Sequence, residues 1–137
     1  MTLAVTEDGR WQLGCQYKRG LRTDSYDLPA GYLETPQEGG LLAAQRELRE
    51  ETGYVADAWR ELGHLVIDSN RGPTAAHIYF AAGAVRRSSQ HLDPTEDLTF
   101  RLYAPNELRE MVYAGRINSL ATVAGIMMGL DILARER

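Results

Sequence analysis

Short segments with strand-like alternation and longer segments with helical periodicity follow one another along this chain. Residues 1–5 and 11–17 predict a β-hairpin, because Asp8 and Gly9 supply a turn between them and the second segment alternates in hydrophobicity. Further strands are predicted over residues 26–29, 58–67, 76–85 and 98–103. The apolar side of the hairpin's second strand is expected to carry Trp11, Leu13, Cys15 and Tyr17.

Residues 38–52 predict the first helix, since they contain no proline and are rich in Leu, Ala, Gln, Arg and Glu. A capping-box pattern over residues 35–38 favours an early start, whereas two successive glycines favour a start at Gly40. Gly53 is expected to end the helix. The helical period predicts an apolar stripe that consists of Leu41, Ala44 and Leu48.

The chain is predicted to be helical from residue 105 onward. A short helix opens at Pro105 or Asn106 and ends before Gly115, and a longer helix is capped by Asn118 or Ser119 and reaches residue 135. The buried face of the last helix is expected to consist of Leu120, Val123, Met127, Leu130 and Ile132.

Three carboxylates share one edge of the first predicted helix. At about 100° per residue, Glu47, Glu50 and Glu51 cluster close to the apolar stripe, although like charges at this spacing cost about 0.2–0.5 kcal/mol per pair. A bound Mg²⁺ would explain the arrangement, because this ion prefers carboxylate oxygens and joins them to substrate phosphates. A solvated acidic face balanced by Arg46 and Arg49 explains it equally well.

The segment from Gly31 to Tyr54 reads GYLETPQEGGLLAAQRELREETGY and resembles the signature of the Nudix hydrolases. That signature runs G-x5-E-x7-R-E-U-x-E-E-x-G-U, where U is a bulky apolar residue. Six residues separate Gly31 from Glu38 where the signature has five, which we interpret as a loop insertion. The positions that match in register are Glu38, Arg46, Glu47, Leu48, Glu50, Glu51, Gly53 and Tyr54.

The resemblance implies an α/β/α sandwich with a mixed central sheet. It also implies hydrolysis of a diphosphate bond with Mg²⁺, or Mn²⁺ as a possible substitute. Arg46 would orient the glutamates, and either Glu50 or Glu96 would accept the proton from the attacking water. Gly31, Glu38 and Gly53 would be structural parts of the signature. The implied metal ligands are Glu47, Glu51, Glu50 and the carbonyl of Ala30.

Two further segments, Gln16-Tyr17-Lys18 and Leu28-Pro29-Ala30-Gly31, are similar to the ADP-ribose pyrophosphatases within that family. The similarity places Lys18 where relatives often have a diphosphate-binding arginine. Arg71 is a second candidate for contact with a phosphate. Residues 68–74 differ from the subgroup, because no carboxylate follows between Asn70 and Ser89.

Several substrates therefore stay open. The leading function is hydrolysis of ADP-ribose or another nucleotide sugar. The alternative enzyme function is hydrolysis of a dinucleoside polyphosphate or a nucleoside triphosphate. The third function is that of a Nudix-like protein that binds a nucleotide without cleaving it. We expect residues 1–137 to form one domain that lacks the subgroup's additional N-terminal β segment. A homodimer is possible, but its mode cannot be taken from the subgroup.

Composition narrows the classes of partner. A net charge of −4 and an isoelectric point near 5.4 argue against nucleic-acid binding. Cys15 is the single cysteine and cannot form an internal disulfide, and no long apolar run suggests a membrane span. We therefore expect a cytoplasmic protein with no membrane partner. The three histidines, which show no metal-ligand spacing, receive no role at this point: His64, His77 and His91.

Overall fold

A mixed β-sheet forms the centre of the protein in a computed structural model that describes residues 1–92, 94 and 97–136. The strand order is β3-β2-β1-β6-β5, and β8, which is not part of this order, also pairs with β2, from Trp11 opposite Tyr103 to Gln16 opposite Leu98. β1 and β6 run parallel, and the other pairs of this sheet are antiparallel. The strands are β1 (Thr2–Val5), β2 (Trp11–Lys18), β3 (Thr23–Asp27), β5 (Ala58–Val66), β6 (Ala75–Ala82) and β8 (Leu98–Tyr103).

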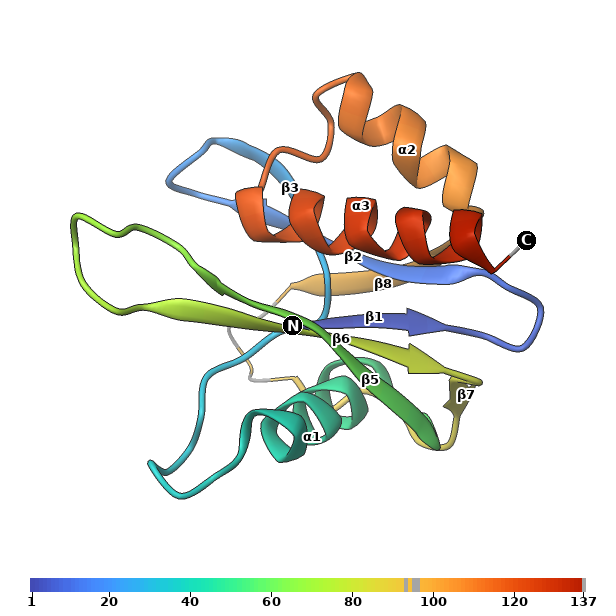
Figure 1. Ribbon diagram of the computed structural model, residues 1–137, viewed down its shortest axis with the longest axis horizontal. Coiled ribbons are helices and arrows are strands. Elements are labelled where there is room, and N and C mark those ends of the chain that lie inside the picture. The colour runs from blue at the N-terminus through green and yellow to red at the C-terminus, as the bar shows by residue number, and fades with distance from the viewer. Residues whose placement is uncertain (93, 95–96, 137) are drawn as a thin grey trace.

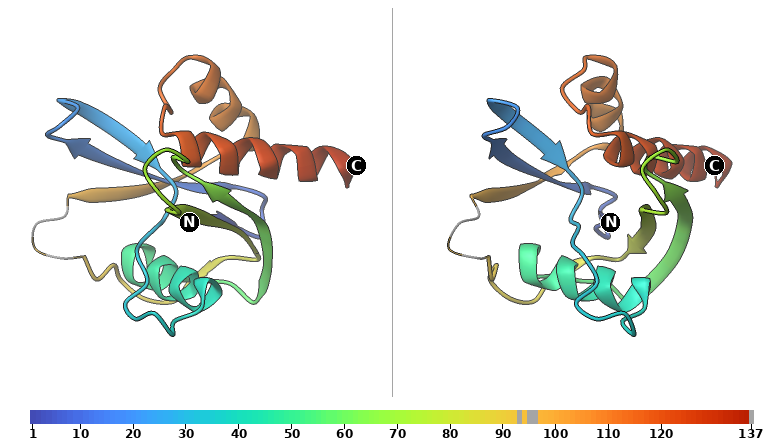
Figure 2. Two further views of the ribbon diagram at one scale, coloured as in Figure 1. Left: turned by 60° about the vertical axis from the view of Figure 1, so that its left-hand side comes forward. Right: turned by 90° about the vertical axis from the view of Figure 1, so that its left-hand side faces the viewer.

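Helices cover both faces of this sheet. α1 (Gly40–Thr52) lies on one face, and α2 (Pro105–Tyr113) and α3 (Leu120–Arg135) lie on the other, as Figure 1 and the rotated views of Figure 2 show. A two-stranded ribbon of β4 (Tyr54–Val55) and β7 (Val85–Arg86) follows the end of α1. The expected α/β/α sandwich with a mixed central sheet is thereby confirmed.

Each face of the sheet has its own apolar core. The larger core lies beneath α2 and α3 and includes Leu3, Trp11, Leu13, Ile126 and Leu130. The smaller core lies beneath α1 and consists of Leu48 together with three alanines, Ala4, Ala81 and Ala84. Because alanines occupy the sheet side of this smaller core, the backbone of α1 can approach the sheet closely.

The buried face of α3 differs from the expected one. Leu120 is 73% exposed and Met127 is 36% exposed, so neither belongs to the core. Glycines take the place of large residues where the helix crosses the sheet: a Cβ on Gly129 would lie 2.9 Å from the ring of Trp11, and one on Gly125 would lie 2.8 Å from Leu28. The residues of α3 that are buried are Thr122, Gly125, Ile126, Gly129 and Leu130.

The start of α1 lies at one of the two predicted positions, whereas β3 is displaced from its predicted place. The helix begins at Gly40 with Gly39 as its N-cap, which decides between the two starts considered. Leu41 is 39% exposed, and the residues that α1 buries are Ala43, Ala44, Leu48 and Thr52. The strand expected over residues 26–29 lies at Thr23–Asp27, because its ladder with β2 continues back to Lys18. Tyr17, expected on the apolar side of β2, is 55% exposed.

None of the helices among the described residues combines the length and the apolar character that crossing a bilayer would require.

Candidate active site

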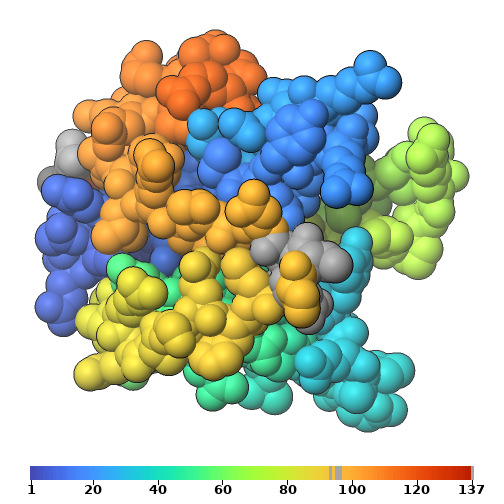
Figure 3. Space-filling view, turned by 180° about the vertical axis from the view of Figure 1, so that it is seen from behind, coloured from blue at the N-terminus to red at the C-terminus, as the bar shows by residue number. Residues whose placement is uncertain are grey.

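The second half of α1 carries the three glutamates, and the chain fixes the end of this helix from several sides. Gly53 adopts φ 75° and donates its N–H to the carbonyl of Arg49, so it ends the helix as expected. The Gly53 carbonyl then accepts the N–H groups of Arg87 and Ser88. Figure 3 shows this later segment, in yellow, spread over the back of the molecule against α1.

Arg46 binds most of the acidic groups of the segment. Its guanidinium donates to Glu38 at 3.0 Å, to Glu47 at 2.8 Å and to Glu50 at 3.3 Å, and it also reaches the backbone carbonyl of Tyr32 at 3.0 Å. The hydrogen bonds to Glu38, the largest cause, and to Glu47 raise the pKa of Arg46 well above its usual value. The ion pair expected between Arg46 and the glutamates is therefore present.

Glu38 has a structural position. Its carboxylate accepts the side chain of Arg46 and, at 2.7 Å, the backbone N–H of Glu34. The hydrogen bond from Arg46, followed by the one from Glu34, lowers the pKa of Glu38 below its usual value. Glu38 thus links the loop between residues 31 and 39 to the helix.

Glu47 and Glu51 meet two consecutive residues of the loop that precedes α1. Glu51 Oε2 accepts the backbone N–H of Ala30 at 2.9 Å. The Glu47 carboxylate lies against Gly31 so closely that a Cβ there would overlap it, with Oε2 at 2.6 Å. A side chain at residue 31 would therefore displace Glu47, which explains why glycine occupies this position.

Glu50 points to a more open surface than its neighbours. Its side chain is 41% exposed, against 16% for Glu47. The Glu50 carbonyl accepts the N–H of His91 at 2.8 Å, and the side chain of Gln90 donates to the Glu51 carbonyl at 2.7 Å. Glu96, the other candidate for the general base, lies outside the described residues.

Two cavities flank the glutamates, and Ala30 lines both. The smaller cavity, of about 180 Å³, contains Glu51 and Lys18. The larger, of about 770 Å³, contains Glu47 and Gly31 at one end. The segment from Ala30 to Gly31 and the glutamates that face it thus form the wall between two spaces in which parts of one ligand could lie.

A comparison with known families decides which family this arrangement belongs to. A model described as the NUDIX domain matches residues 3–123. The chain is a Nudix family member. Its match covers the glutamate helix, the loop before it, the sheet and the first residues of α3.

Curated Nudix relatives include two named ADP-ribose pyrophosphatase. The protein of Mycobacterium tuberculosis (strain ATCC 25618 / H37Rv) is 30% identical over 127 residues, which are 91% of this chain and 61% of the relative. The protein of Bacillus subtilis (strain 168) is 30% identical over 95 residues, which are 69% of this chain and 51% of the relative. The chain thus spans between half and two thirds of the length of these relatives.

A solved structure titled "Crystal structure of ADP compounds hydrolase" has the same fold. It superimposes with a TM-score of 0.86 at 20% sequence identity and covers 99% of this chain and 72% of that one. At this identity the likeness shows the Nudix fold alone.

The structure places the two candidate substrate-binding residues differently. Lys18 lines the smaller cavity together with Glu51, and its Nζ donates to Gln16 at 2.5 Å. Arg71 lies at the tip of the β5–β6 hairpin, where its side chain is 89% exposed and pairs with Asp68 at 3.5 Å. Arg71 lines neither cavity, so the structure does not bring it together with the Nudix glutamates.

Sequence reasoning missed Asp27, which lines the smaller cavity with Glu51 and Lys18. Its carboxylate accepts the hydroxyls of Ser25 at 2.8 Å and Thr122 at 3.0 Å, so β3 and α3 both hold it. The only signal in the sequence was its place next to the Leu-Pro-Ala-Gly run. Asp27 adds a fixed negative charge and hydrogen-bond acceptor beside the lysine.

The Nudix glutamates fit a hard divalent cation in their chemistry. Glu47 and Glu51 offer carboxylate oxygens on neighbouring turns of one helix, and the contacts with Ala30 and Gly31 bring both to the same loop. Among the described residues, no three His, Cys, Asp or Glu side chains are gathered as a ready-made metal cluster. Mg²⁺ typically binds proteins through one or two carboxylates, water and substrate phosphates, and Glu47 and Glu51 supply two such carboxylates.

Proposed function

We propose that this Nudix domain hydrolyses the diphosphate bond of a nucleoside diphosphate derivative with Mg²⁺, and that ADP-ribose or another nucleotide sugar is the substrate. The observation that carries the proposal is the placement of Glu47 and Glu51 against residues 30 and 31, in the wall between two cavities. A diphosphate bound at this wall would have room for one group on each side.

Glu47 and Glu51 would hold the cation, with the Ala30 carbonyl as a further oxygen ligand. Bound there, Mg²⁺ would supply neutralisation of the diphosphate charge and a lower pKa for the attacking water. Arg46 would keep Glu47 and Glu50 oriented through the hydrogen bonds described above. Lys18, which lines the smaller cavity with Ala30 and Glu51, would contact the diphosphate as a point charge.

In the chemical step, the water oxygen forms a bond to one phosphorus as the bridging P–O bond breaks. The water proton passes to a carboxylate, and either Glu50 or Glu96 would accept it. Glu50 suits the role through its exposure, since a water molecule can reach a side chain that is 41% exposed.

The names of the two curated relatives and of the solved structure favour a nucleotide that carries ADP. One observation favours a second candidate class, the dinucleoside polyphosphates or nucleoside triphosphates. The β5–β6 loop lacks the carboxylate that the ADP-ribose pyrophosphatase subgroup tends to carry, and its Arg71 lies away from the glutamates. A substrate panel separates the two classes.

The test is hydrolysis of ADP-ribose, other nucleotide sugars, dinucleoside polyphosphates and nucleoside triphosphates, each with Mg²⁺, Mn²⁺ or EDTA. We expect turnover of one class, no turnover in EDTA, and a loss of at least a hundredfold, about 2.7 kcal/mol of activation free energy, in Glu51→Gln. Glu110→Gln, which removes a similar charge from the exposed face of α2, is the control. Intact substrates that nonetheless raise the melting temperature would refute the enzyme and indicate a binding protein.

A further inference from the structure

A pair of stacked imidazoles lies on the α1 side of the sheet. His64 of β5 and His77 of β6 are directly opposite each other in the antiparallel ladder. Their ring centroids are 4.1 Å apart and their planes differ by 11°. Gly63 and Leu65, the neighbours of His64 in the chain, point to the other face, where a Cβ on Gly63 would lie 3.0 Å from Met128 of α3.

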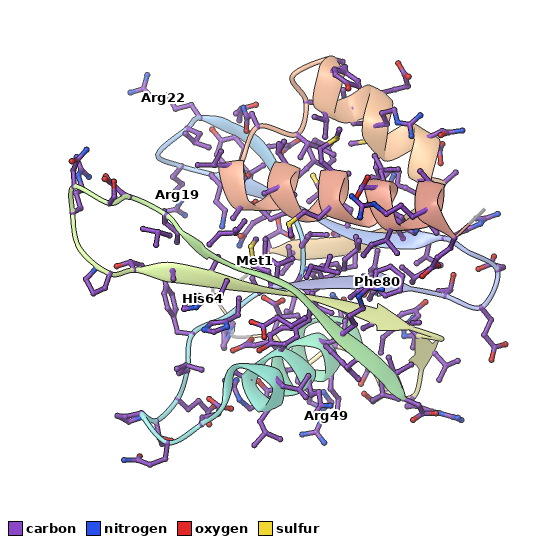
Figure 4. All side chains as sticks on the ribbon, in the orientation of Figure 1. Met1, Arg19, Arg22, Arg49, His64 and Phe80 are labelled. Carbon is purple, nitrogen blue, oxygen red and sulfur yellow. The ribbon has the colours of Figure 1, made fainter. Side chains whose placement is uncertain are left out.

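Neighbouring groups fix the inner ring of the pair. His77 Nδ1 lies 3.0 Å from Glu61 Oε1, and the Tyr79 ring lies parallel to the imidazole within 11°. The first residue of α1 lies against this inner ring, since a Cβ on Gly40 would lie 3.3 Å from His77 Cγ and 2.8 Å from the Tyr79 hydroxyl. The outer ring, His64, is exposed on the side of the sheet that carries α1 (Figure 4).

Both imidazoles line the 770 Å³ cavity that has Glu47 and Gly31 at its other end. The loop that leads to α1 adds exposed apolar groups to this cavity, with Tyr32 92% exposed and Leu33 51% exposed. The volume lies in the usual range for small-molecule sites, about 300–1,000 Å³. The cavity is therefore acidic at one end and lined by flat and apolar groups at the other.

A ligand that matches both ends would carry a diphosphate, which reaches Glu47 through a cation, and a planar ring. We propose that the His64–His77 pair is the platform on which the nucleobase of the substrate stacks. The inference rests on the proposed function, because the glutamate end supplies the position of the diphosphate. Bases stack on imidazole and aromatic rings of proteins regardless of sequence, and the loss of one such ring weakens binding about tenfold or more.

The first experiment needs no turnover. AMP and ribose 5-phosphate differ only in the base, and the chain has three histidines, so their ring-proton NMR signals can be assigned individually. At fixed pH and with Mg²⁺ present, we expect AMP to shift the signals of His64 and His77 upfield by its ring current, whereas ribose 5-phosphate leaves them in place. His91 does not line the cavity, and its backbone N–H contacts Glu50, so its signal reports a ligand at the glutamates away from the platform.

The second experiment uses the substrate that the panel identifies. We expect His64→Ala to raise KM about tenfold while kcat changes less than twofold, and His64→Phe, which keeps a flat ring, to restore KM. Leu65→Ala is the matched control, because this residue is adjacent in the chain and points to the opposite face of the sheet.

Either experiment can refute the stacking of the base on His64 and His77 without refuting the proposed reaction. AMP that shifts His91 but not His64, AMP that shifts neither, or a KM unchanged in His64→Ala would each place the base elsewhere. Turnover that survives in Glu51→Gln would instead refute the metal-dependent reaction. A platform that binds AMP in the NMR experiment would stand even then.

Discussion

Replacing Gly31 by alanine should lower the catalytic activity of this protein and leave its stability nearly unchanged. The new Cβ would lie 2.6 Å from Glu47 Oε2 and nearer still to Oε1 and Cδ. Ordinary contact begins near 3.4 Å, so the carboxylate must move by roughly 1 Å or more. Glu47 is a flexible side chain at its far end and can move, but it then leaves its 2.8 Å hydrogen bond with Arg46.

A displacement of this size at a metal-binding carboxylate should lower kcat/KM about a hundredfold, which corresponds to about 2.7 kcal/mol. Stability should change little, since alanine removes conformational freedom from the unfolded chain and offsets about 0.4–1 kcal/mol of the lost ion pair. The assay is kcat/KM on the best substrate of the panel, beside thermal unfolding of the same preparation.

Gly39→Ala is the matched control for this prediction. Gly39 lies in the same loop, and a Cβ there would meet no atom within 4 Å. We expect it to keep at least half of the activity. A Gly31→Ala protein that retains full activity would show that Glu47 need not stay where the structure places it, and that part of the mechanism would have to be abandoned.

Three further predictions concern stability and pH. Gly129→Ala should destabilise the protein by about 1–2 kcal/mol in denaturant unfolding. The cost of overpacking against Trp11 should exceed the gain of about 1 kcal/mol in helix propensity. An unchanged unfolding midpoint would mean that α3 can move away from the sheet. Gly53→Ala should cost about 2 kcal/mol or more in the same assay, since this residue has φ 75° and its Cβ would overlap a backbone carbonyl, so equal stability would contradict the assigned helix end. The pKa of Glu38 is lowered in the fold by Arg46, so the stability that Glu38 adds is full above its usual value of 4.5 and is lost as the pH falls through the lowered value. Melting temperatures of wild type and Glu38→Gln should therefore differ at neutral pH and converge in acid, and a difference that grows in acid would reverse the sign of this argument.

The sequence predicted the elements better than the faces they bury. Hydropathy periodicity predicts the bounds of α3 within a residue, yet it predicts Leu120 and Met127 in the core because both are large and apolar. The structure buries Gly125 and Gly129 instead, since the close approach of the helix to the sheet leaves no room for a side chain. A hydropathy pattern read from large apolar residues does not reveal a helix face that packs on a sheet through glycines.

The sequence likewise predicted some of the contacts in the candidate site and not others. The glutamates and Arg46 stand close together in the sequence, so their fixed spacing on a helix was enough to predict which of them meet. His64 and His77 meet only through the register of a hairpin, which the sequence did not specify. Asp27 lies beside Glu51 because the strand order of the sheet brings β3 there, and nothing in the local sequence encodes that order.

The parallel pairing of β1 with β6 has a kinetic consequence. Thr2 lies opposite Tyr79 in this ladder, so two segments far apart in the chain must meet before the centre of the sheet exists. Pairings between distant segments are slow to form, because the entropy of closing the intervening loop is lost before the contacts stabilise it. The loop that bears Ala30 is joined to β1 through the hydrogen bond from Thr2 to Pro29. During refolding, helical content should therefore recover first. The wall formed by residues 30 and 31 and the glutamates that face them should be complete only when the whole chain has folded.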